Sequence, residues 1–130
     1  MPDGVNWQVE IIPDDADVFM RAHRTFFNRK RELQPGVFRP RDGGMSVDWD
    51  KYSSPEATRQ RAPKPQENAV ISLAVSGIRR IGNLDVKHTP DETAELMNRA
   101  HSDVVGFPEG EDLTEVRTLL LAASSIVLGL

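Results

Sequence analysis

The chain of 130 residues contains no cysteine. That absence excludes a disulfide scaffold, a cysteine-based zinc site and a thiol nucleophile. Long apolar runs are also missing, because the longest, over 119–130, is interrupted by two serines and is too short to cross a bilayer. The first ten residues lack the basic and apolar segments of a secretion signal. We therefore expect a cytoplasmic protein that does not contact membranes.

Several motifs of common catalytic sites are missing as well. The sequence has no Walker loop, no G-x-G-x-x-G and no G-x-S-x-G. His101-Ser102-Asp103 contains the residue types of a hydrolase triad, but adjacent residues point in different directions and cannot form the relay. The other histidines, His23 and His88, are not spaced with His101 as metal ligands on a helix. We expect no metal and no cofactor.

The charge is distributed unevenly along the chain, although the formal net charge is only -4. Residues 1–20 contain five acidic and no basic residues, and residues 81–130 contain nine acidic and three basic residues. Residues 21–80, in contrast, contain thirteen Lys and Arg against six Asp and Glu. This basic centre indicates a surface for an anionic partner, such as nucleic acid or a nucleotide. In the alternative interpretation, the acidic ends fold against the centre and neutralise it.

The first part of the chain predicts a strand followed by a helix. Apolar and polar residues alternate over 5–12, which indicates a strand. Pro13 and the acidic residues after it are typical of a helix start, so the sequence favours a helix over 13–30. A strand over 19–27 is the competing interpretation.

A tight turn is predicted at Asp42-Gly43-Gly44, because these residues adopt positive φ readily. The segments 36–39 and 45–49 would form a hairpin around it. The polar, proline-containing segment 51–68 is predicted to be a mobile loop, in which Ser54 caps at most one helical turn. The alternation places two sets of residues on opposite faces of the second hairpin strand: Met45, Val47 and Trp49 on the buried face, Ser46 and Asp48 on the exposed face.

The second half predicts more strands and two helices. Strands are expected over 69–78 and 84–88, an extended segment over 101–107, and a helix from Thr89 to about Ala100. A last helix over 113–127 would bury one apolar stripe: Val116, Leu119, Leu120, Ala123, Ile126 and Val127. These elements predict a single α+β domain over residues 1–130, with a mixed or antiparallel sheet of four or five strands and two or three helices.

The candidate site residues are scattered along the sequence. His101 can exchange a proton near neutral pH, and Ser46 lies on the exposed face of its strand, so both are candidate catalytic residues together with His23. Each has an ordinary alternative, for example a structural histidine or a solvated surface residue. The candidate ligand-binding residues are all basic: Arg24, Arg59, Arg61, Lys64, Arg79, Arg80 and Arg99.

Two resemblances involve these residues. Met45–Trp49 and Asn98–Gly106, with His23-Arg24 and Phe38, resemble small uncharacterised bacterial proteins that carry an S-V-D strand and an N-x-x-H-x-x-[VI]-x-G segment. This resemblance covers about 100 residues and implies a bacterial origin but no activity.

The second resemblance is to ADP-ribosyltransferases of the Arg–Ser–Glu type. Arg24, Ser46 and the pair Glu109 and Glu111 occur in the required order. The resemblance implies that Arg24 and Ser46 hold a dinucleotide and that the glutamate positions the attacking group. This sequence departs from the family because Ser46 lacks the S-T-S context and Arg24 lies only 22 positions before it.

Three functions remain open. The first is a binding module for nucleic acid or a nucleotide, acting as a small subunit of a bacterial assembly. The second is a nucleotide-processing enzyme that uses His101, Ser46, His23 and Arg24. The third is a protein-interaction subunit. Convergence of the site residues would favour the enzyme, a flat basic face with exposed Trp49 and Tyr52 would favour nucleic acid, and an exposed apolar patch would favour the subunit.

Overall fold

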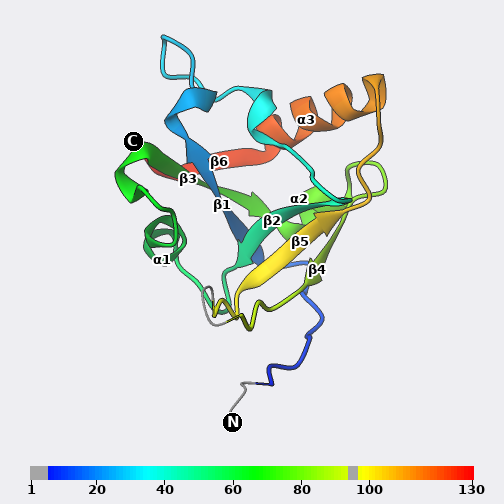
Figure 1. Ribbon diagram of the computed structural model, residues 1–130. Coiled ribbons are helices and arrows are strands. Elements are labelled where there is room, and N and C mark those ends of the chain that lie inside the picture. The colour runs from blue at the N-terminus through cyan, green and yellow to red at the C-terminus, as the bar shows by residue number, and fades with distance from the viewer. Residues whose placement is uncertain (1–5, 94–96) are drawn as a thin grey trace.

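The computed structural model describes residues 6–93 and 97–130, which form one α+β domain around an antiparallel sheet (Figure 1). The sheet has six strands in the order β4-β5-β2-β1-β3-β6, rather than the four or five expected. The strands are β1 (Asp17–His23), β2 (Gly44–Trp49), β3 (Asn68–Ala74), β4 (Asp85–His88), β5 (His101–Val105) and β6 (Ser124–Leu128). The described residues also form three helices, α1 (Pro55–Gln60), α2 (Val75–Arg79) and α3 (Glu111–Ala123). Three 3-10 turns connect other parts of the chain: η1 (Arg24–Phe26), η2 (Pro35–Val37) and η3 (Pro65–Glu67).

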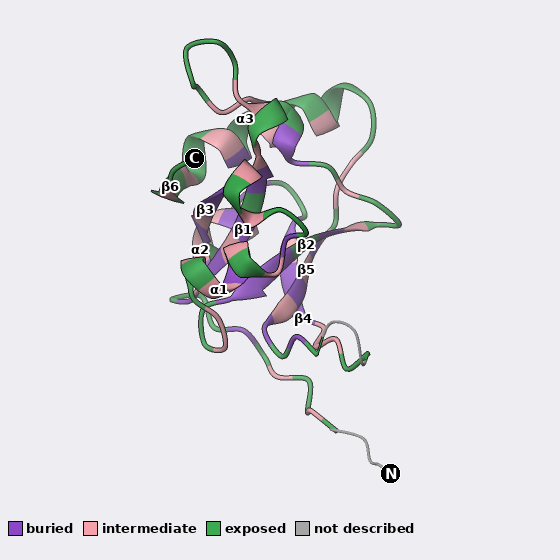
Figure 2. Ribbon diagram, turned by 60° about the vertical axis from the view of Figure 1, so that its left-hand side comes forward, coloured by how far each residue is buried: buried purple, intermediate pink, exposed green. Residues whose placement is uncertain are grey.

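The strands at the centre of the sheet are largely buried (Figure 2), and one face of the sheet forms the hydrophobic core. Alternate residues of the central strands point into it, and the predicted buried face of β2 is confirmed. Residues of α2, α3 and the segment before β1 pack on the same cluster. The central core residues of β1 and β2 are Val18, Met20, Ala22, Met45, Val47 and Trp49. The opposite face, called the outer face below, therefore carries the remaining residues of these strands.

The N-terminal predictions are wrong in two places. Residues 6–12 form no strand, although Ile12 is buried in the core; Val5 lies outside the described residues. The expected helix over 13–30 is a tight turn at 13–16 followed by β1, so the competing strand interpretation is closer. β1 hydrogen-bonds to β2 on one side and β3 on the other, and this pairing outweighs the local helix-start signal.

In the middle of the chain, the turn at 42–44 is confirmed but its hairpin is not. Asp42 and Gly43 adopt positive φ, yet residues 35–37 form η2 and β2 pairs with β1 and β5. Ser54 caps α1 by accepting the backbone N–H of Ala57 at 3.1 Å, as expected. The mobility of 51–68 remains a prediction. The strand expected over 69–78 ends at Ala74, and α2 begins at the next residue, Val75.

In the last third, β4 and β5 confirm the two short strands. The helix expected from Thr89 is absent from 89–93 and 97–100, whereas residues 94–96 lie outside the described residues. Asp91 and Asn98 instead exchange two backbone hydrogen bonds of 2.9 and 2.7 Å. The described residues between β4 and β5, 89–93 and 97–100, are called the β4–β5 connection below.

The last helix is shorter than expected. α3 ends at Ala123, and β6 pairs with β3 at the edge of the sheet, because Ser124 and the β-branched Ile126 and Val127 favour an extended chain. Val116 and Leu120 are buried, but the remainder of the predicted stripe is not: Leu119, Ile126 and Val127 are each more than 40% exposed. No helix in 6–93 or 97–130 has the length and apolar character needed to cross a membrane.

Candidate functional site

The outer face of the sheet brings together four polar residues from two distant parts of the chain. In the β2–β5 ladder, Asp48 is paired with His101 and Ser46 with Asp103, so all four side chains point to the same face. Ser102, between the two β5 residues, points into the core and is fully buried. The register therefore separates the His101-Ser102-Asp103 triplet and places His101 beside a different serine, Ser46.

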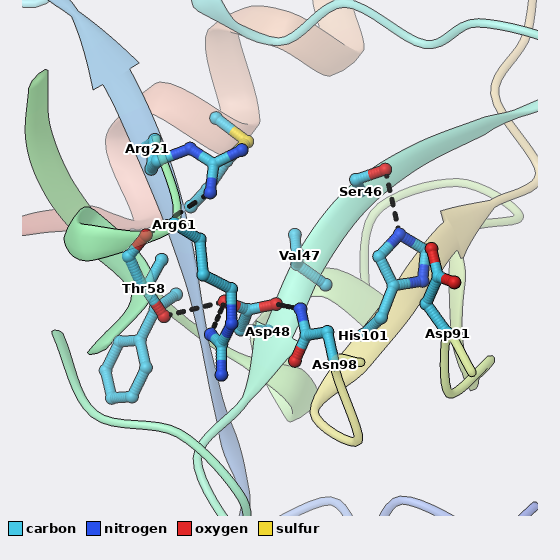
Figure 3. Close-up of a pocket in the computed structure, with 11 residues that line it drawn as sticks. Arg21, Ser46, Val47, Asp48, Thr58, Arg61, Asp91, Asn98 and His101 are labelled. Carbon is cyan, nitrogen blue, oxygen red and sulfur yellow. Dashed lines mark hydrogen bonds and ion pairs between the residues drawn. The ribbon is translucent and has the colours of Figure 1, made fainter. Parts of the chain in front are cut away.

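A pocket of about 280 Å³ lies over this part of the outer face (Figure 3). Strands β1, β2 and β5 form its floor. The α1 region contributes one wall, and Asp91 and Asn98 of the β4–β5 connection contribute the other. The lining residues are Phe19, Met20, Arg21, Ser46, Val47, Asp48, Thr58, Arg61, Asp91, Asn98 and His101.

Asp48 links the two walls of the pocket to its floor. Its carboxylate is nearly buried and accepts hydrogen bonds from Thr58 Oγ1 at 2.8 Å, Arg61 Nη1 at 2.7 Å and Asn98 Nδ2 at 2.8 Å. Arg61 also donates to Ser53 Oγ at 3.1 Å. A buried carboxylate with three donors and a guanidinium partner is well satisfied. Asp48 thus fixes α1 and the Asn98 side of the β4–β5 connection relative to the sheet.

His101 and Ser46 form the second polar group of the pocket. His101 Nε2 lies 3.2 Å from Ser46 Oγ. On the other side of the ring, Nδ1 lies 2.9 Å from the backbone oxygen of Thr89 and 3.0 Å from Thr89 Oγ1, which donates to Asp103 Oδ2 at 3.1 Å. A chain of hydrogen bonds therefore runs from Asp103 through Thr89 and His101 to Ser46.

The pocket lining also includes a second acid, Asp91, and a second base, Arg21. The hydrogen bond from the backbone N–H of Thr93 lowers the pKa of the Asp91 carboxyl, so Asp91 is anionic at neutral pH. Arg21 is exposed and donates from Nη1 to the backbone oxygen of Thr58 at 3.2 Å. Among the described residues, no carboxylate lies within ion-pair distance of Arg21.

Two of the predicted catalytic residues, His101 and Ser46, lie together, but His23 and Arg24 do not join them. His23 Nε2 and Arg24 Nε lie 3.2 and 3.5 Å from Glu67 Oε1, at the far end of β1. Of the residues of the ADP-ribosyltransferase resemblance, only Ser46 lines the pocket, since Arg24 pairs with Glu67, and Glu109 and Glu111 are exposed around the start of α3.

The predicted basic ligand-binding residues are mostly held by other contacts. Arg59 donates to the backbone oxygens of Asn68 and Gly129, and Lys64 lies 3.9 Å from Glu67. Of the seven predicted residues, only Arg61 lines the pocket.

The other three predicted basic residues lie elsewhere on the surface. Arg79 pairs with Asp14 and Asp85 at 2.7 and 2.8 Å, and these ion pairs join the basic centre to both acidic ends. Arg99 lies 3.9 Å from Glu10, and Arg80 is exposed at the end of α2. The acidic ends thus neutralise part of the basic centre.

Sequence reasoning missed Arg21 and Thr58. The helix expected over 13–30 includes Arg21, whereas the strand alternation of Val18, Met20 and Ala22 places Arg21 on the polar side. Thr58 is buried because α1 packs on the outer face, which its polar sequence did not indicate. Trp49 is only 3% exposed, so it cannot serve as the exposed aromatic side chain expected for nucleic-acid binding.

In the described part of the chain, no group of three or more His, Asp or Glu side chains is arranged to hold a metal ion. No protein-family model, curated protein or solved structure matches the chain.

Proposed function

We propose that the pocket on the outer face binds a small ligand that carries an anionic group, such as a nucleotide or another organic phosphate. The observation that carries this proposal is Arg21. It is an exposed guanidinium on the pocket lining, and no carboxylate of the described residues pairs with it. Guanidinium groups bind phosphate and carboxylate through paired hydrogen bonds.

The size of the pocket supports a small ligand rather than a nucleic-acid strand. Its 280 Å³ lies near the lower end of the ~300–1,000 Å³ usual for small-molecule sites. Strand binding requires exposed aromatic platforms and a continuous basic groove. Trp49 is buried, and Arg59, Arg61 and Arg79 contact other parts of the protein.

The lining divides the pocket into regions of different chemistry. Arg21 offers charge at one side, whereas Asp91 at the other side repels anions. Phe19 of β1 lines the floor of the pocket and offers an apolar surface. A ligand with one anionic end directed towards Arg21 and a neutral, polar end directed towards His101 and Ser46 fits this arrangement.

The proposal is tested with Arg21→Gln, which removes the charge and keeps a polar side chain. The matched control is Arg80→Gln, which makes the same change at an exposed site outside the pocket. Calorimetry with inorganic phosphate, AMP and ATP should show binding that weakens about tenfold or more in Arg21→Gln and is unchanged in the control.

Two results would count against the proposal. One is equal weakening in both variants, which would indicate a nonspecific charge effect. The other is preferential binding of a single-stranded oligonucleotide with a steep salt dependence, which would favour an extended basic surface.

A further inference from the structure

We propose that Ser46 is a nucleophile and His101 its general base, in a site that transfers acyl groups from small esters. The inference rests on the proposed function only for the substrate class, an ester that also carries a carboxylate or phosphate. The nucleophile itself is inferred from the hydrogen bonds of His101.

The partners of His101 determine which ring nitrogen carries the proton. Nδ1 lies 2.9 Å from the backbone oxygen of Thr89, which can only accept a hydrogen bond. The Thr89 hydroxyl, 3.0 Å from Nδ1, gives its own proton to Asp103. Nδ1 therefore holds the proton of the neutral ring, and Nε2 presents its lone pair to the Ser46 hydroxyl at 3.2 Å.

This arrangement meets the two geometric requirements of an activated serine. The base is within hydrogen-bond reach of the nucleophile, and a third group orients the base. Here the orienting group is the Thr89 carbonyl, and Thr89 Oγ1 connects the ring to the Asp103 carboxylate.

The surroundings also allow a substrate to reach the pair. Ser46 is exposed, and its hydroxyl and His101 both line the pocket. Figure 3 shows the serine and the imidazole on one side of the pocket and Arg21 and Arg61 on the other. A substrate whose anionic group binds at Arg21 would extend its carbonyl towards Ser46.

The reaction balances without a further reactant except water. Ser46 Oγ forms a bond to the carbonyl carbon while its proton passes to Nε2 of His101. The bond from that carbon to the leaving alcohol breaks, and the alcohol oxygen takes the proton from His101. Water then attacks the acyl carbon, giving its proton to Nε2, and Ser46 leaves with that proton, so ester and water become acid and alcohol.

The first experiment tests the nucleophile without any anionic ligand. A fluorophosphonate probe should attach phosphorus to Ser46 Oγ and release fluoride, which peptide mass spectrometry of the folded protein detects. Ser46→Ala should abolish this label, and Ser125→Ala, an exposed serine on β6, should leave it unchanged. His101→Ala should lower the labelling rate by about 10²-fold or more.

His101→Gln provides a second variant in case the alanine variant does not fold, because its amide can still donate to Thr89 but cannot act as the base. Absence of label on folded wild-type protein would overturn the proposal. A wild-type labelling rate in either folded His101 variant would overturn it as well.

The second experiment separates this proposal from anion binding. The 4-nitrophenyl half-ester of succinic acid should be hydrolysed faster than 4-nitrophenyl acetate, and Arg21→Gln should remove that preference. If Ser46 is labelled but neither anions nor the half-ester are preferred, the proposed function fails and the nucleophile stands. If anions bind but Ser46 is not labelled, the nucleophile fails and the proposed function stands.

Discussion

Asp48 should be the polar residue whose loss destabilises the protein most, because it connects the sheet with both walls of the pocket. Its carboxylate receives three donors, and the Arg61 partner is only 26% exposed. Asp48→Ala would leave this guanidinium and the Asn98 amide without their acceptor. Removing one partner of a buried ion pair costs about 3–5 kcal/mol. Since Arg61 keeps some contact with water, we expect about 3 kcal/mol.

The measurement is urea unfolding followed by circular dichroism, together with a thermal scan. For a chain of this size, a loss of about 3 kcal/mol lowers Tm by roughly 10 °C. Asp48→Asn should also destabilise, by about 2 kcal/mol, because one amide oxygen replaces two acceptors and the amide nitrogen faces a donor.

A double-mutant cycle tests the cause of this effect. Arg61→Met combined with Asp48→Ala removes both charges, so the double variant should lose about 2 kcal/mol less than the sum of the single variants. Strict additivity, or a cost of Asp48→Ala below about 1 kcal/mol, would refute the reasoning that Asp48 fixes the walls through buried hydrogen bonds.

Two further predictions concern the core and the surface charge. Leu120 of α3 is fully buried, so Leu120→Ala should lower the free energy of unfolding by about 2–5 kcal/mol. An unchanged urea midpoint would show that α3 is not part of the core. Arg79 lowers the pKa of Asp85 to about 2, so this carboxylate stabilises the fold above about pH 4 and loses that contribution as the pH falls through 2. The Asp85 side chain is 38% exposed and screened by solvent, so Asp85→Asn should lower the free energy of unfolding by only about 1 kcal/mol at pH 7. The stability of this variant should also fall less than that of the wild type between pH 4 and pH 2. If variant and wild type are equally stable both at pH 7 and at pH 2, this reasoning is wrong.

The sequence predicts those parts of the fold in which local pattern and tertiary pairing agree. The alternation of Met45, Val47 and Trp49 predicts β2 and its buried face. Ser54 before Pro55 predicts a single capped helical turn, and α1 begins there but extends over six residues. Where the two disagree, local reasoning fails. Pro13 and its acidic neighbours indicate a helix, but pairing on both sides makes 17–23 a central strand.

The sequence predicts the candidate site only in part, because local pattern identifies polar residues on strands but not which strands are neighbours. His101 and Ser46 are recognisable as polar residues on extended segments, but only the β2–β5 register places them 3.2 Å apart. Strand order cannot be read from one sequence, because any two strands could be neighbours. The helix expected over 13–30 conceals the position of Arg21 on the outer face, and the sequence does not reveal that His23 and Arg24 lie beside Glu67 instead of in the pocket.

The contacts within the pocket join residues that are far apart in the sequence, and this constrains how the protein can fold. Ser46 and His101 are 55 positions apart, and Asn98 and Asp48 are 50 apart. Contacts of such sequence separation require large loops to close, which is entropically costly and slow. A ligand of the pocket therefore has no binding site until β1, β2 and β5 have assembled. Its presence should slow the unfolding rate while leaving the refolding rate of the chain unchanged.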